Sequence, residues 1–151
     1  MKPGMGKIVR VSRQYAASAE EVFDAWMAPE HARQFFFATS DGEMVRMEMD
    51  ARVGGSFRVI ERREGVCVDY TGIYMEITRP RRLTFLLSAP FYGLSGNRVS
   101  IAVLHMAQGC EVVVSHEGVT EEAAERTEAV WRAILEGLQR ELSSAETAAP
   151  K

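Results

Sequence analysis

A stretch near the end of the chain, residues 120–142, constrains the fold more than any other feature. Its apolar side chains recur at intervals of three or four residues, and the positions between them are mostly Glu and Arg. The recurring residues are Ala123, Thr127, Val130, Trp131, Ile134, Leu135, Leu138 and Leu142. This spacing predicts one long amphipathic helix. Such a helix must bury its apolar side, and the rest of the chain, which has the pattern of strands and turns, offers a sheet as the partner.

The bulk properties of the chain exclude several classes of protein. A length of 151 residues is typical of one domain. A net charge of -3 argues against a nucleic-acid partner, which normally requires a basic surface. No run of about 18 apolar residues is present, so we predict no membrane partner. Residues 1–6 lack the apolar core of a signal peptide, and we therefore expect a cytoplasmic protein.

The two cysteines fit that compartment. Cys67 and Cys110 both lie in strand-like segments, and we interpret them as small buried hydrophobic residues. A disulfide or a reactive thiol is the alternative. No CxxC pair is present, so the cysteines do not indicate a zinc site.

Hydrophobic patterning and turn signals predict seven strands and two short helices ahead of the long helix. The strands are expected at residues 7–15, 44–50, 57–62, 66–78, 83–88, 98–106 and 110–117, with a loop at 89–97. Ser18 and Glu21 form a capping box for the first short helix, which ends before Pro29. The second begins at Pro29 and runs to about Phe35. We expect a single domain over residues 7–142, with flexible termini at 1–6 and 143–151.

Three short segments of the sequence allow local structural predictions. Gly72 interrupts a long strand, where we expect a bulge or a bend. The alternation in residues 44–50 places Val45, Met47 and Met49 on one face of their strand. Three consecutive phenylalanines at residues 35–37 allow two interpretations: two are buried while one covers a loop, or the three form the wall or lid of a cavity.

Five segments together resemble one protein family. They are ASAEEVFDAWMAPEHARQFF (17–36), GGSFR (54–58), TGIYMEITRPRRLTF (71–85), EVVVSHEG (111–118) and VWRAILEGLQREL (130–142). In this order they resemble the SRPBCC or START-like superfamily, in the branch named after the activator of the heat-shock chaperone ATPase. Members of that branch often have Trp-Trp where this chain has Phe35-Phe36, and Gly-Trp where it has Val130-Trp131.

The resemblance implies an α+β helix-grip fold, in which a curved antiparallel sheet of about seven strands wraps around the long C-terminal helix. Two short helices are expected between the first two strands. A strongly curved sheet leaves room for a pocket beneath the helix. The residues expected to line this cavity are Phe35, Phe36, Met47, Tyr70, Tyr74, Glu76, Phe85, Ile101, His116, Val130, Trp131 and Ile134.

Few residues are candidates for chemistry. Glu76 shares strand parity with Tyr70 and Tyr74 and becomes an acid or base if that face lines the cavity, or else pairs with Arg58 or Arg82 on a neighbouring strand. His105 and His116 both have inward parity, yet they lie toward different strand ends and are not expected to meet. His31 is interpreted as a surface residue. No HxH or HExxH spacing occurs, so we predict no metal and no cofactor.

Three hypotheses for function follow. The first is a module that binds a small hydrophobic molecule between the final helix and the sheet. The second is an enzyme of the cyclase or hydrolase-like type acting on an apolar substrate, for which the sequence assigns no catalytic residue. The third is a module that binds a chaperone through an exposed apolar patch at residues 35–37 or 91–94. A homodimer remains open.

Overall fold

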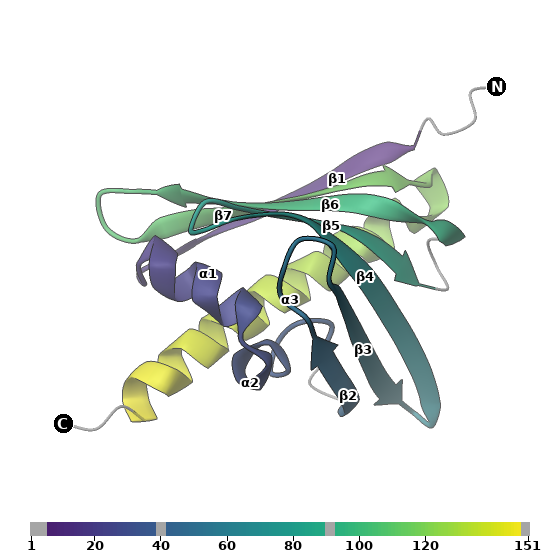
Figure 1. Cartoon of the computed structure of the whole chain (residues 1–151), viewed down its shortest axis with the longest axis horizontal. Coiled ribbons are helices and arrows are strands. Elements are labelled where there is room, and N and C mark those ends of the chain that lie inside the picture. Colours follow the sequence, from purple (N-terminus) through teal and green to yellow (C-terminus); the bar gives the residue numbers. More distant parts are fainter. Residues whose placement is uncertain (1–5, 39–41, 90–92, 149–151) are drawn as a thin grey trace.

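A single antiparallel sheet forms most of the molecule (Figure 1). The computed structural model describes residues 6–38, 42–89 and 93–148. Its elements in chain order are β1 (Lys7–Tyr15), α1 (Ala19–Met27), α2 (Pro29–Ala32), β2 (Glu43–Met49), β3 (Ser56–Arg63), β4 (Val66–Thr78), β5 (Arg82–Ala89), β6 (Gly93–His105), β7 (Cys110–Val119) and α3 (Glu121–Ala148). The seven strands have the spatial order β1-β7-β6-β5-β4-β3-β2. The predicted α+β helix-grip fold is thereby confirmed.

The long helix α3 crosses one face of the curved sheet, as Figure 1 shows. Its buried side consists of Trp131, Ile134, Leu135 and Leu138, each at most 1% exposed. Burial of these side chains is the main reason why the helix packs here, since each contributes about 1.5–3 kcal/mol when removed from water. The helix ends at Ala148, six residues beyond the predicted end. No helix within the described ranges is long and apolar enough to span a membrane.

The helix α1 begins with the predicted capping box. The Glu21 amide donates to Ser18 Oγ at 3.1 Å, and the Ser18 amide donates to the Glu21 carboxylate at 3.1 Å. The helix ends at Met27, and Ala28 after it is extended because Pro29 follows. Pro29 then opens the one-turn helix α2. Both helices lie on the same side of the sheet as α3 (Figure 1).

All three phenylalanines at residues 35–37 are buried, each at most 3% exposed. The interpretation that one of them covers a loop is therefore wrong. Phe37 has a φ of 55°, and this left-handed turn directs its ring inward beside the other two. These residues do not form the exposed patch that the chaperone hypothesis requires. The other expected patch, at residues 91–94, has side chains outside the described part of the chain.

Two β-bulges shift the strand parity that the sequence suggested. The pairing of β2 with β3 shifts between Met44 and Arg46, so Met44, Met47 and Met49 pack against the core while Val45 is exposed. The expectation that Val45 shares one face with Met47 and Met49 is therefore wrong. The second bulge lies in β4, between Tyr74 and Glu76.

Gly72, where a bulge was expected, instead pairs regularly with Phe57 and Leu87. The reason for glycine is close packing, because a Cβ atom at this position would lie 2.2 Å from the Phe57 ring. Strand β6 also begins earlier than predicted, at Gly93 within the expected loop.

The cysteines differ in their surroundings. Cys110 is buried as predicted, but Cys67 is exposed, so its interpretation as a buried residue is wrong. Cys67 lies on β4 opposite Arg62 of β3. Both thiols are free.

Candidate functional site

A half-open pocket lies between the middle of α3 and strands β3 and β4, and we call it the α3–β4 pocket. Its volume is about 230 Å³. It is lined by Phe37, Ala38, Glu61, Arg63, Tyr70, Arg126, Ala129, Val130, Ala133 and Ile134. The lining residues of α3 are spaced by three or four positions and therefore share one side of the helix. Small side chains at Ala129 and Ala133 leave space between this side and the sheet.

Aromatic rings form the inner wall of the pocket. The rings of Phe37 and Tyr70 stack with centroids 4.1 Å apart and planes 9° apart. Phe37 also contacts Trp131 on α3, at a centroid distance of 5.6 Å. The inner wall is therefore aromatic and mostly apolar.

Charged groups form the other part of the lining. Glu61 is 1% exposed, and its carboxylate lies 3.2 Å from Arg63 Nε. Arg63 in turn donates to the Tyr70 hydroxyl at 3.4 Å. Arg126 contributes a second guanidinium from α3. Among the described residues, two cations and one carboxylate therefore lie in the lining of a pocket whose other side chains are mostly apolar.

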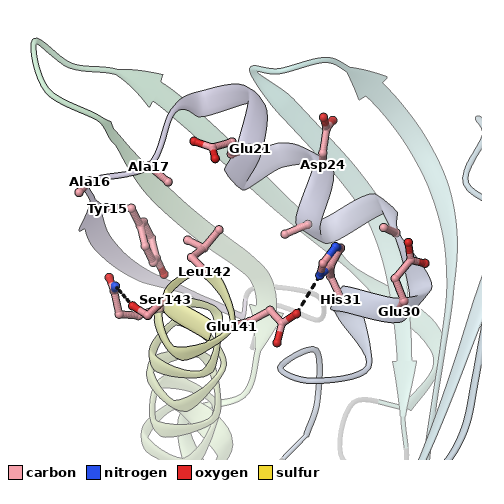
Figure 2. A pocket seen from close by; sticks show the side chains of 13 residues that line it. Tyr15, Ala16, Ala17, Glu21, Asp24, Glu30, His31, Glu141, Leu142 and Ser143 are labelled. Atoms are coloured by element: carbon pink, nitrogen blue, oxygen red, sulfur yellow. Dashed lines mark hydrogen bonds and ion pairs between the residues drawn. The ribbon is translucent and has the colours of Figure 1, made fainter. Parts of the chain in front are cut away.

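A larger hollow separates α1 and α2 from the last turns of α3, and we call it the α1–α3 groove (Figure 2). Its volume is about 690 Å³. Three of its four carboxylates have partners within the protein. Glu141 pairs with His31 at 2.8 Å, Asp24 binds Arg79 at 2.8 Å, and Glu21 caps α1. The Arg79 hydrogen bond lowers the pKa of Asp24, as expected for a structural ion pair.

The structure brings three of the predicted cavity residues to the α3–β4 pocket: Tyr70, Val130 and Ile134. Most of the others are packed in the core behind it. These are Phe35, Phe36, Tyr74, Phe85, Ile101, His116 and Trp131, each at most 3% exposed. Met47 is half-buried on β2 and packs against the same core. The aromatic side chains thus fill most of the space in which the resemblance implied a cavity.

Glu76 lies apart from these residues. The β4 bulge after Tyr74 reverses its parity, so the inward placement inferred from Tyr70 and Tyr74 is wrong. The Glu76 carboxylate lies 3.3 Å from Arg82 Nε and accepts a hydrogen bond from Thr78. The alternative interpretation, a carboxylate paired with Arg82 on the neighbouring strand, is confirmed.

The histidines do not form a common site. His116 is buried and accepts a hydrogen bond from Trp131 Nε1 at Nδ1, over 3.0 Å. Burial lowers its pKa from 6.5 to about 4. His105 keeps the predicted parity in the regular pairing of β6 with β7, but it lies at the end of β6 and is exposed, so only one of the two histidines is buried. Among the described residues, no three His, Cys, Asp or Glu side chains are placed to hold a metal ion.

Sequence reasoning missed the charged residues of the pocket. Glu61 and Arg63 lie on the same face of β3 as Phe57 and Val59, and both Phe57 and Val59 are buried. This shared parity was a usable signal, because a carboxylate on the inward face of a strand requires a partner. Arg126 and the alanines of α3 carried no comparable signal.

The family model described as "Activator of Hsp90 ATPase homolog 1-like protein" matches residues 16–143. No curated protein matches the sequence. An AHSA1-like protein of Aeromonas hydrophila has a TM-score of 0.81 and 21% identity, with 96% of this chain and 98% of that chain covered.

Two further solved structures have the same fold. A protein of Chromobacterium violaceum has a TM-score of 0.78 and 21% identity, over 88% of this chain and 94% of its own. A protein of unknown function from Staphylococcus aureus has a TM-score of 0.82 and 14% identity, over 93% and 96%. At these identities the likeness shows the fold alone.

Proposed function

The chain belongs to the family of Activator of Hsp90 ATPase homolog 1-like proteins, a family with a ligand-binding type of domain, and from this premise we propose that it binds a small hydrophobic molecule in the α3–β4 pocket. The observation that carries the proposal is the lining of this pocket, which combines a stacked aromatic wall with two alanines of α3. Ligand sites are typically concave and mostly apolar, with a few convergent polar groups.

The volume of the pocket defines the size of the ligand. An engineered apolar cavity of about 150 Å³ is enough to hold benzene. A pocket of about 230 Å³ therefore accepts one substituted ring or a short branched chain. The cytoplasm is the proposed location, and the free thiols of Cys67 and Cys110 support it.

The test is an NMR titration of protein labelled at its alanine methyl groups, with toluene and benzyl alcohol as probes. Ala129 and Ala133 line the pocket, so their signals should shift in a saturable manner. The signal of Ala107, which is exposed in the turn between β6 and β7, should stay in place. Native mass spectrometry of the purified protein would show in parallel whether a ligand is already bound.

Pocket-filling variants make the test specific. Ala133→Leu places three more carbon atoms in the pocket and should abolish the shifts, whereas Ala107→Leu makes the same change at an exposed turn and should preserve them. Absence of any shift with either probe, or shifts that persist in Ala133→Leu, would contradict the proposal.

An enzyme of the cyclase or hydrolase-like type is the second candidate, and the contacts among Glu61, Arg63 and Tyr70 favour it. A buried carboxylate beside a guanidinium and a phenol meets the requirement for convergent polar groups. Glu61 would act as the base. Incubation with candidate apolar substrates should then give a product that Glu61→Gln fails to form while it still binds the substrate.

A further inference from the structure

We propose that a second site, on the outer face of the sheet, binds small phosphate monoesters that carry an apolar substituent. The outer face is the one opposite to α1, α2 and α3 (Figure 1). The site is a hollow of about 520 Å³ where the turn between β4 and β5 meets the last residues of β6, and we call it the β4–β6 hollow. It is separate from the α3–β4 pocket, so this inference does not depend on the proposed function.

The strand register places the polar part of the hollow on the outer face. Thr78, Arg82 and Ala102 line the hollow and form one row across β4, β5 and β6. Leu83 and Ile101, which follow and precede this row in their strands, pair with each other and are buried. Because side chains alternate along a strand, the row itself faces away from α3.

The carboxylate that lines the hollow is already engaged. Glu76 Oε1 lies 3.3 Å from Arg82 Nε, and Glu76 Oε2 accepts a hydrogen bond of 2.9 Å from the Thr78 hydroxyl. Arg82 Nη2 also donates to Ser100 Oγ at 3.4 Å. These contacts hold the Arg82 guanidinium against the sheet, and they use only part of its five N–H donors.

Arg81 brings a second guanidinium to the rim of the hollow. Its backbone is fixed on both sides, since its amide donates to the Thr78 carbonyl at 2.7 Å and its carbonyl accepts from the Val103 amide at 2.9 Å. Its side chain is exposed, and its guanidinium has no hydrogen-bond or ion-pair partner in the described part of the chain. His105, also exposed, adds an imidazole from the end of β6.

This set of donors fits a phosphate group. A phosphate monoester has three terminal oxygens and a charge of about -2 at neutral pH, and guanidinium groups bind such oxygens with charge-assisted hydrogen bonds. Arg81 and Arg82 offer N–H donors from two neighbouring residues, whereas Glu76 is bound by Arg82 and Thr78. Both guanidinium groups reach water, so the phosphate keeps part of its hydration when it binds.

The hollow also has an apolar part. Leu104 is 48% exposed and lines the hollow together with Ala102. A cavity of about 150 Å³ is enough to hold benzene, so the hollow has room for a ring beside the phosphate group. An apolar substituent would cover Leu104, and we therefore expect a monoester to bind more tightly than the bare phosphate ion.

The experiment titrates ¹⁵N-labelled protein with phenyl phosphate, inorganic phosphate and phenol in a phosphate-free buffer at pH 7.5. The amide signals of Val103 and Leu104 report on the hollow, and that of Ala129 reports on the separate α3–β4 pocket. Phenyl phosphate should shift the first two in a saturable manner and bind about tenfold more tightly than inorganic phosphate. Phenol should leave them in place, and 0.5 M NaCl should weaken the binding of both phosphates.

Three variants assign the binding to side chains of the hollow. Arg81→Gln should weaken both phosphates about tenfold, and the fold should be retained because the Arg81 side chain has no partner in the described part of the chain. Arg33→Gln is the control, since it removes the same charge from the exposed arginine that follows α2, outside the hollow. Leu104→Ala should reduce the advantage of phenyl phosphate and leave the affinity for inorganic phosphate unchanged.

The contrary outcomes are distinct from those of the proposed function, because they concern signals of β6 rather than of α3. Absence of a saturable shift at Val103 and Leu104 with either phosphate would overturn the site. Equal weakening by Arg81→Gln and Arg33→Gln would also overturn it, since binding would then reflect only the overall charge. Equal affinity for phenyl phosphate and inorganic phosphate would overturn the apolar substituent as part of the ligand.

Discussion

The indole of Trp131 on α3 donates a hydrogen bond to Nδ1 of His116 on β7, over 3.0 Å and in a fully buried position. Because Nδ1 accepts this hydrogen bond, the neutral imidazole carries its proton on Nε2. This hydrogen bond connects α3 to β7 within an otherwise apolar core. A protonated His116 would lose the bond, since both ring nitrogens would then be donors.

Stability should therefore fall as the pH drops from about 6.5 to about 4. In this range the unfolded chain holds a proton on His116 and the folded protein does not, so the free energy of unfolding rises with pH. A lowering of the pKa from 6.5 to about 4 corresponds to a loss of about 3 kcal/mol over this range. Urea unfolding at a series of pH values from 7.5 to 4 measures this loss in the free energy of unfolding. The His116→Gln variant should show a flatter dependence and His105→Gln the original one; equal slopes for all three proteins would refute the assignment.

The two tryptophans should respond differently to replacement by phenylalanine. Trp131→Phe removes the donor to His116 and should cost about 2–3 kcal/mol, the loss of a buried hydrogen bond together with some packing. The Trp26 Nε1 atom is buried and has no hydrogen-bond partner among the described residues. Trp26→Phe removes this unsatisfied group and should cost less. Chemical denaturation of both variants at pH 7.5 gives the comparison, and a smaller loss for Trp131→Phe would contradict it.

Gly72 and Phe57 should be energetically coupled. A Cβ atom at residue 72 meets the Phe57 ring at 2.2 Å, and that ring is held by Phe36 and Phe85 at centroid distances of 5.1 Å each. Gly72→Ala should therefore destabilise the protein by about 1–3 kcal/mol. In a Phe57→Leu background the same substitution should cost clearly less. A double-mutant cycle measures the coupling, and additive effects would show that the ring moves aside without cost.

The stack of Phe37 on Tyr70 should contribute beyond the burial of either ring. A cycle with Phe37→Leu and Tyr70→Leu should give a coupling energy of about 1 kcal/mol. Tyr70→Phe serves as the control, since it keeps the stack and removes only the hydroxyl that accepts a long hydrogen bond from Arg63. This control should change stability by less than about 1 kcal/mol. A coupling energy near zero would mean that the two rings act independently.

Hydrophobic periodicity was sufficient to predict the elements and their order. Two strands have the predicted bounds, Lys7–Tyr15 and Val66–Thr78, because each is a long run of strand-forming residues between clear turn signals. The burial of His116 also follows from its parity with Val112 and Val114. These features depend on local pattern alone.

The pocket was less predictable, because it depends on deviations from regular alternation. The bulge in β4 moved Glu76 to the outer side of the sheet, and the left-handed residue Phe37 brought a third ring into the core. A single extra residue in a strand reverses the direction of every side chain after it, and no propensity scale locates it. Glu61 was overlooked because a buried carboxylate requires a partner, and the contact with Arg63 is visible only in the structure.

The order of the strands has a consequence for how the chain assembles. Strand β1 is made first, yet its hydrogen-bonding partner is β7, with Tyr15 opposite Cys110 and Lys7 opposite Val119. About a hundred further residues must be synthesised before β1 can pair with β7. The hairpins from β2 to β7 can form in sequence meanwhile, since each pairs with its neighbour in the chain. The first strand to leave the ribosome is thus among the last to be hydrogen-bonded, and until then its edge is open to other chains.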